Sequence, residues 1–283
     1  MTNVLIVLSA ADHWTRADGS LYPTGVWAEE FIVIDEAFAS AGFTVDLATP
    51  DGVVPTIDPL SLEARVVGDD TAARYRDYLA AHAERLARPR VLAEVDPLAY
   101  DAIVVPGGHG PVEDLYKDAD MGRVLVAADE AGKVIGSVCH GPAALLAARD
   151  TDGRWIFEGR RMTAFTDEEE IEFGTADNAP WLLARNLRDR GAYSSKVRTG
   201  ASSPCRMATL LPARTRRLAR RSPRRSLPRS RPEASLDVGA TGSCGPVAPN
   251  LLAVSSSTWG GMNATCASLN FDLLMVAPRS VAR

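Results

Sequence analysis

The chain reads KVIGSVCHGPAALLAA over residues 133–148. Residues 133–138 are a short apolar run typical of a buried parallel strand, and residues 143–148 favour a helix. Cys139 therefore stands where a strand turns sharply into a helix, which lifts a nucleophilic side chain out of a sheet. A helix N-terminus and the neighbouring His140 both favour the thiolate over the thiol. A buried structural cysteine is the alternative interpretation, but the turn favours a catalytic one.

Strands and helices alternate on both sides of this segment. The pattern predicts an α/β fold, in which a flavodoxin-like parallel sheet is sandwiched by helices. An insertion over residues 52–100 interrupts the alternation, and we expect it to cap a cleft. The predicted strands lie at 4–8, 43–48, 101–105 and 133–138, and the predicted helices at 25–40, 72–87, 119–130 and 143–148.

Three loops of this predicted sheet end at one edge. Ligands of such sheets bind outside the carboxyl ends of the strands. Residues 9–24 follow the first strand, the glycine-rich residues 106–110 follow the third, and Cys139 follows the fourth. We therefore expect the functional site at this edge. His13 and Trp14, in the first loop, are hypothetical substrate contacts.

Composition restricts the class of protein. The chain has 283 residues, 46% of them hydrophobic, and a formal net charge of −5. No run approaches the ~20 apolar residues of a membrane span, and the N-terminus enters a strand without a signal-peptide pattern. We expect a cytoplasmic protein with no membrane partner. Only Cys139 among the four cysteines lies in the first two thirds of the chain, which argues against a disulfide framework.

Three motifs together resemble one known family. They are TGVWAEE at residues 24–30, PGGHG at 106–110 and VCHGP at 138–142. In this order they resemble the ThiJ/PfpI superfamily, which has the class I glutamine amidotransferase-like fold, and within it the branch of heat-shock chaperones and glyoxalase III. The resemblance covers residues 1–192.

The resemblance implies roles for four side chains. Cys139 maps to the family's nucleophile and His140 to the histidine that follows it. Glu30, rather than Glu29, maps to the acid that contacts the cysteine sulfur. A further acid maps to Glu170, with Asp167 as second choice.

The resemblance also implies an oxyanion-binding loop. In the family, two backbone N–H groups that map to Gly108 and His140 hold the oxyanion. Gly107 and His109 belong to the same predicted substrate-binding loop.

The implied activity is a cofactor-independent, glyoxalase III-type conversion of methylglyoxal-like 2-oxoaldehydes to 2-hydroxy acids, a lyase of the D-lactate dehydratase type. The resemblance implies a small aldehyde substrate and a homodimer, and we expect neither a cofactor nor a metal ion. Two alternatives remain open: a stress-response holding chaperone, and a cysteine-dependent amidase or peptidase.

Residues 193–283 differ in character from the rest. Nine arginines crowd between residues 214 and 231 with Ser and Pro, a composition that predicts disorder and could indicate a nucleic-acid-binding arm. However, residues 204–218, back-translated with permitted codons and read two bases later, give VPDGNLVTGQNPAS, which is similar to a family segment missing here. We infer a frameshift near residues 190–193, in the gene or in its sequencing. We therefore predict a largely disordered tail that cannot pair with the sheet, no nucleic-acid partner, and a chain that the altered C-terminus can inactivate.

Overall fold

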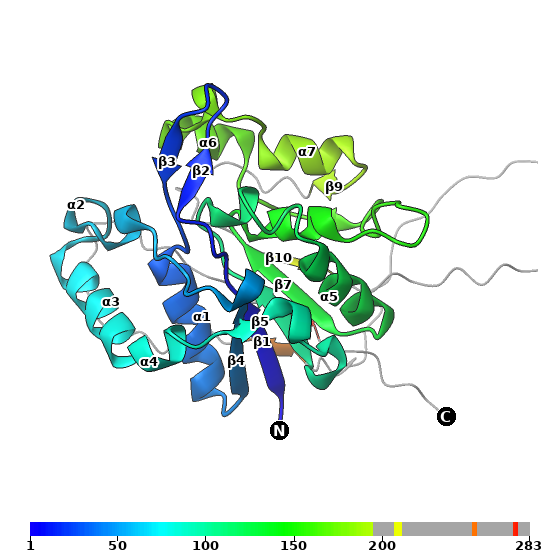
Figure 1. The fold of residues 1–283 in the computed structure, drawn as a ribbon, viewed down its shortest axis with the longest axis horizontal. Helices are drawn as coiled ribbons and strands as arrows, with labels where there is room; N and C mark the ends of the chain where they lie inside the picture. The colour runs from blue at the N-terminus through cyan, green and yellow to red at the C-terminus, as the bar shows by residue number, and fades with distance from the viewer. Residues whose placement is uncertain (195–206, 211–250, 254–273, 277–283) are drawn as a thin grey trace, which may run out of the picture. The chain divides into compact units, whose positions relative to one another are not determined.

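The computed structural model describes residues 1–194, 207–210, 251–253 and 274–276. A six-stranded sheet, in the order β10-β7-β6-β1-β4-β5, organises the fold (Figure 1). Its strands are parallel except β10, which confirms the predicted α/β, flavodoxin-like class. The strands are β1 (Asn3–Val7), β2 (His13–Thr15), β3 (Leu21–Pro23), β4 (Thr44–Thr49), β5 (Arg90–Val91), β6 (Ala102–Val105), β7 (Val134–Val138), β8 (Arg161–Met162), β9 (Tyr193–Ser194), β10 (Met207–Leu210), β11 (Leu251–Ala253) and β12 (Leu274–Val276).

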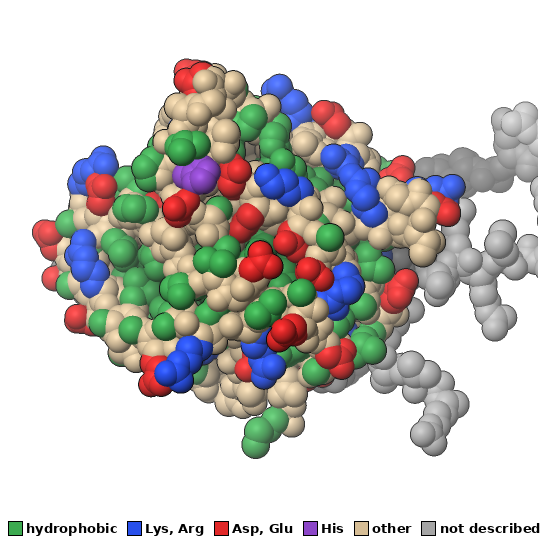
Figure 2. Space-filling model, viewed as in Figure 1, with side chains coloured by type: hydrophobic (Ala, Val, Ile, Leu, Met, Phe, Trp, Pro, Cys, Tyr) green, Lys and Arg blue, Asp and Glu red, His purple; other side chains and the backbone are tan. Residues whose placement is uncertain are grey.

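Helices flank this sheet. The α-helices are α1 (Ala28–Ser40), α2 (Ala64–Val67), α3 (Asp69–Ala81), α4 (Ala83–Leu86), α5 (Ala119–Glu130), α6 (Asp167–Phe173) and α7 (Leu183–Asp189), and the 3₁₀ helices include η2 (Pro59–Leu62) and η6 (Gly141–Ala147). Acidic side chains gather over the middle of the face drawn in Figure 2, and Lys and Arg lie mostly towards its edges.

Side-chain alternation along β1 divides the core into two layers. Successive residues of a strand point to opposite faces. Val4 and Ile6 belong to one buried cluster with the apolar face of α1, and Leu5 and Val7 belong to the other with the apolar face of α5. All four side chains are fully buried. A strand buried on both faces reads as a continuous apolar run, which explains why β1 was predictable.

Two helices differ from the prediction, one in its first residue and the other in its helix type. α1 starts at Ala28, three residues after the predicted start, because Gly25 lies against the insertion, where a Cβ would come within 2.2 Å of the Thr56 carbonyl oxygen. The segment after Cys139 is a seven-residue 3₁₀ helix, η6, rather than an α-helix. A short 3₁₀ turn has a weaker dipole than a long α-helix, so the electrostatics at Cys139 depend on side chains.

The predicted loop 9–24 contains an antiparallel hairpin, β2–β3. Its tip is tied to the segment after α6, because Ala17 N donates to the Asn178 carbonyl oxygen, and Figure 1 shows the hairpin beside α6. The insertion packs on α1 through α3, where the Phe31 and Tyr78 rings meet edge to face.

One part of the predicted tail does pair with the sheet. Met207–Leu210 forms β10, antiparallel to β7, so the prediction that the tail cannot pair is wrong for these four residues. Without β10, β7 would be an edge strand, and the backbone N–H and C=O groups of an edge strand can pair with any extended segment, whatever its side chains. Residues 195–206 and 211–250, where most of the predicted tail falls, lie outside the described residues, as do 254–273 and 277–283.

Candidate active site

Cys139 directly follows β7 with a φ of 56°, a left-handed backbone conformation that non-glycine residues rarely adopt. Two glycines let the neighbouring loop approach it. A Cβ on Gly107 would lie 2.7 Å from the Cβ of Cys139, and one on Gly108 would lie 2.2 Å from the Gly25 carbonyl oxygen. The close packing of loops 24–27, 106–110 and 139–141 therefore depends on glycine.

His140 lies between the cysteine sulfur and a buried carboxylate. Its Nδ1 is 3.3 Å from the Sγ of Cys139, and its Nε2 is 2.8 Å from Oε2 of Glu170. A carboxylate only accepts hydrogen bonds, so Nε2 carries a proton and Nδ1 faces the sulfur. The three residues form a Cys–His–Glu chain whose members are each at most 9% exposed.

The Glu170 carboxylate accepts hydrogen bonds from two histidines. Its other oxygen, Oε1, accepts from Nε2 of His109 at 2.9 Å and from Oγ1 of Thr175 at 2.6 Å. The His109 and His140 rings lie 4.1 Å apart between centroids. One carboxylate thus fixes the orientation of both imidazoles.

Glu30 approaches the same centre from α1. One of its carboxyl oxygens, Oε2, accepts from the backbone N–H of Gly107 at 2.6 Å. Its side chain is 2% exposed. Burial raises the pKa of Glu30 well above its ordinary value, and the adjacent Cys139 adds to the rise. The raised pKa favours the protonated form of Glu30, whose O–H can serve as a donor.

The two histidines titrate in opposite directions. Burial alone lowers the pKa of His140, but the Cys139 sulfur and Glu170 outweigh it and raise the pKa to about 10. Burial and the nearby His140 lower the pKa of His109. Burial favours a protonated Glu170, yet the hydrogen bonds from His109 and His140 hold its pKa well below the ordinary value. The cluster therefore combines a charged His140, a neutral His109 and an ionised Glu170.

Two backbone donors lie next to the sulfur. Within the described part of the chain, the N–H groups of Gly108 and His140 take part in no backbone–backbone hydrogen bond outside helices and strands. The Gly107 N–H, by contrast, is occupied by Glu30. Gly107, predicted as part of the substrate-binding loop, therefore uses its N–H to hold Glu30.

We expect Glu30→Gln to stabilise the protein more at pH 8 than at pH 5. An unfolded glutamate ionises near 4.5, whereas folded Glu30 has a raised pKa. Its contribution to stability is therefore complete below about pH 4.5 and is lost as the pH rises towards the folded pKa. Glutamine does not ionise and keeps an oxygen for the Gly107 N–H. Thermal unfolding at both pH values measures the difference, at roughly 2–4 °C per kcal/mol for a domain of this size.

The control for this variant is Glu172→Gln, which changes an exposed glutamate of α6. Its effect on the unfolding temperature should be small at both pH values. A Glu30→Gln difference that stays constant from pH 5 to pH 8 would contradict the raised pKa of Glu30.

The structure brings together all seven predicted site residues and separates the second choices from them. Glu29 interacts with Tyr75 of the insertion, and Asp167 pairs with Arg188. Trp14 stacks on His109 with the ring centroids 4.9 Å apart, whereas His13 pairs with Asp12 on the surface.

Sequence reasoning missed three polar groups around the site. Thr175 donates to Glu170. Tyr22 meets His109 edge to face at 6.1 Å. Asp58, from the insertion, accepts from Oγ1 of Thr24 at 2.7 Å, and burial raises its pKa. The insertion therefore reaches the site through Asp58, and no local motif signals this contact.

His109, His140 and Glu170 place one ligand-type atom each within 4.8 Å of one another. The nitrogens and oxygens already satisfy each other through the two histidine–carboxylate hydrogen bonds. This bonding explains the closeness of the three groups without an ion.

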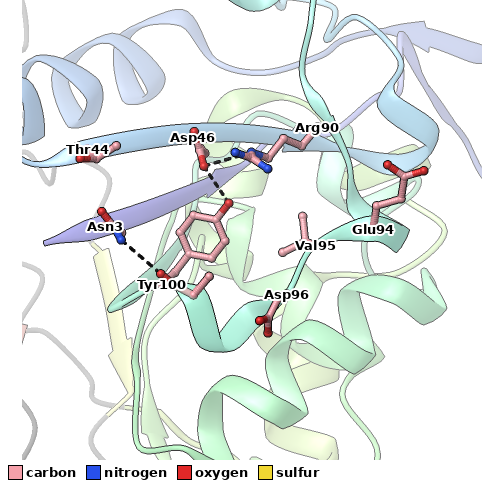
Figure 3. A pocket seen from close by; sticks show the side chains of 9 residues that line it. Asn3, Thr44, Asp46, Arg90, Glu94, Val95, Asp96 and Tyr100 are labelled. Carbon is pink, nitrogen blue, oxygen red and sulfur yellow. Dashed lines mark hydrogen bonds and ion pairs between the residues drawn. The ribbon is translucent and has the colours of Figure 1, made fainter.

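A separate cavity of about 290 Å³ lies at the other end of the strands (Figure 3). It adjoins Asn3 and Thr44, at the starts of β1 and β4, and Asp46 within it accepts from Tyr100 Oη and pairs with Arg90. None of the predicted site residues lines it.

Among the described helices, none is long and apolar enough to cross a membrane.

Comparison with known proteins places the chain among characterised relatives. The sequence model of the DJ-1/PfpI family matches residues 21–200. The protein/nucleic acid deglycase HchA of Pseudomonas aeruginosa is 30% identical over 204 residues, which cover 66% of this chain and 67% of the relative. Glyoxalase 3 of Candida albicans is 27% identical over 186 residues, covering 62% and 74%. The crystal structure of Candida albicans glyoxalase III superposes with a TM-score of 0.59 at 23% identity, covering 71% of this chain and 85% of the other, and shows the same fold.

Proposed function

Because the chain belongs to the DJ-1/PfpI family, we propose that it is a glyoxalase III-type enzyme. It converts methylglyoxal-like 2-oxoaldehydes to 2-hydroxy acids through a thiolate at Cys139. The names of two relatives, a glyoxalase and a deglycase, support an aldehyde or a glycated group as substrate.

The observation that carries the proposal is that two proton-carrying side chains, His140 and Glu30, both interact with the sulfur of Cys139. Cys139 contacts the charged His140, which supports a thiolate–imidazolium pair. Glu30, whose raised pKa favours the protonated form, also interacts with Cys139. An electrophilic carbon at Sγ would therefore meet two proton donors.

The first step is addition to the aldehyde. The Cys139 thiolate attacks the aldehyde carbon, and the carbonyl oxygen becomes an alkoxide. In this proposal, the backbone N–H groups of Gly108 and His140 donate hydrogen bonds to the alkoxide as an oxyanion hole. Protonation gives a hemithioacetal.

The second step moves hydrogen between adjacent carbons. A base removes the proton from the former aldehyde carbon, and a proton is returned to the neighbouring carbonyl carbon through an enediol. The first carbon is oxidised to a thioester and the second is reduced to an alcohol, so no external oxidant is required. His140 and Glu30 are the proton carriers available at the sulfur. Water then hydrolyses the thioester, which releases the 2-hydroxy acid and the free thiol.

The test is an assay of the full chain with methylglyoxal. Loss of the aldehyde together with equimolar lactate, in the presence of a metal chelator and without added thiol, supports the proposal. Suppression of aggregation of a heat-denatured client protein, measured beside it, identifies a holding chaperone. Hydrolysis of amide substrates without lactate formation identifies an amidase or peptidase and contradicts the proposal.

A further inference from the structure

Aromatic rings border the catalytic cluster on the side of α6. Phe165 lies 4.5 Å from His140 and Phe173 lies 5.9 Å from His109, both measured between ring centroids. Trp27 meets Phe173 edge to face at 6.2 Å, and Phe165 meets Phe173 at 6.4 Å with a 90° interplanar angle. We call Trp27, Phe165 and Phe173 the aromatic wall.

The segments that hold the catalytic groups also hold this wall. Phe165 N donates to the Cys139 carbonyl oxygen, and Trp27 N donates to that of Gly107. Phe173 follows Glu170 by three residues on α6, a spacing that places two side chains on the same face of a helix. The wall is therefore fixed relative to the sulfur.

Phe173 retains an open surface. It is 39% exposed, although its ring contacts His109 and two other aromatic rings. Trp27 and Phe165 are half-buried. An exposed phenylalanine beside a functional site offers apolar surface that a ligand can cover.

The hairpin β2–β3, which lies beside α6 (Figure 1), adds a cation to the surroundings of the cluster. It contributes Trp14 and Tyr22, and the Arg16 guanidinium lies 4.3 Å from the Tyr22 ring centroid. Arg16 also donates to the Thr175 carbonyl oxygen. The hairpin therefore combines two aromatic rings with a guanidinium, whereas the aromatic wall consists of aromatic side chains.

We propose that Phe173 is a specificity-determining residue, and that the aromatic wall selects 2-oxoaldehydes with an aromatic or bulky apolar substituent over those with a methyl group. The inference rests on the proposed function, because it concerns the group attached to the second carbonyl carbon. With the aldehyde carbon at Sγ of Cys139, this substituent packs on the partly exposed ring of Phe173.

The experiment compares phenylglyoxal with methylglyoxal, using initial rates before arginine modification becomes appreciable. The unchanged protein should show a higher kcat/KM for phenylglyoxal. Phe173→Ala should lower that value by about tenfold, mainly through KM, and should change the methylglyoxal value less than threefold, as expected for loss of an apolar contact to one substituent. Phe173→Leu keeps an apolar side chain but removes the aromatic ring, so it distinguishes selection by aromatic contact from selection by any apolar contact.

Ile171→Ala is the matched control, because Ile171 is a 64% exposed apolar residue of the same helix. It should leave the ratio of the two kcat/KM values unchanged. An equal loss for both aldehydes in Phe173→Ala, or a ratio that Ile171→Ala alters as much, would overturn the inference.

A second measurement does not depend on the proposed activity. Alkylation of Cys139 by phenacyl bromide and by bromoacetone compares an aromatic with a methyl substituent on the same electrophile. The unchanged protein should react faster with phenacyl bromide relative to free cysteine, and Phe173→Ala should remove the advantage. If neither aldehyde is turned over but this advantage is present, the proposed function fails and the aromatic selection stands. If the advantage is absent, the selection fails.

Discussion

We expect Cys139→Ala to abolish conversion of 2-oxoaldehydes while the protein stays folded. The proposed reaction forms a covalent bond to Sγ, and alanine offers no nucleophile. The loss should be on the order of 10³-fold or more, as for other covalent nucleophiles. Lactate formation from methylglyoxal measures activity, and circular dichroism and thermal unfolding measure the fold.

Cys205→Ala is the matched control for this variant, since it removes a thiol from the predicted tail. It should retain the activity of the unchanged protein. Near-normal turnover by Cys139→Ala would remove Cys139 from the mechanism, and loss of turnover in both variants would point to a general effect of thiol removal.

Glu170→Gln should reduce turnover by about 10³–10⁴-fold, as the loss of an orienting carboxylate does in Ser–His–Asp triads. Glu170 accepts from Nε2 of both His109 and His140. An amide has one accepting oxygen, and its NH₂ group would face one of these N–H donors. His140 would lose the charge that helps to raise its pKa to about 10, so the thiolate would lose its partner. The midpoint pH for alkylation of Cys139 by iodoacetamide should therefore rise.

Glu170→Gln should also change how the thermal stability of the protein depends on pH. The pKa of folded Glu170 lies below its ordinary value of 4.5, so its contribution to stability is present above about pH 4.5 and is lost as the pH falls. Glu170→Gln should therefore unfold at a lower temperature at pH 7, and the gap should narrow towards pH 3. Glu168→Gln, at an exposed position of the same helix, should change neither activity nor the alkylation profile.

The sequence predicted best those helices and strands whose bounds are set by residues within or next to the element itself. The predicted bounds of α5, residues 119–130, agree with the structure, because Asp118 caps the helix by accepting from Met121 N and Gly132 follows its end. The apolar runs of β1, β6 and β7 were predictable for the same reason, since strands buried on both faces need apolar side chains throughout.

Contacts between distant segments were harder to predict. The strands of the hairpin β2–β3 have three residues each, too few for a period of two to be recognised. Thr175 and Asp58 reach the site only through the tertiary fold. The local sequence could have separated Glu170 from its neighbours, because Thr166 and Glu169 form a capping box that occupies Glu169 and leaves the next residue on the inner face.

The backbone conformation at Cys139 has a cost in stability. A φ of 56° costs a non-glycine residue roughly 1–2 kcal/mol, and this is a sizeable share of a domain's total of about 5–15 kcal/mol. Selection for thermal robustness alone would therefore favour glycine at position 139. If the thiol is the nucleophile, the chain carries that strain for the sake of reactivity, and stabilising substitutions elsewhere are the route by which an engineered version could tolerate it.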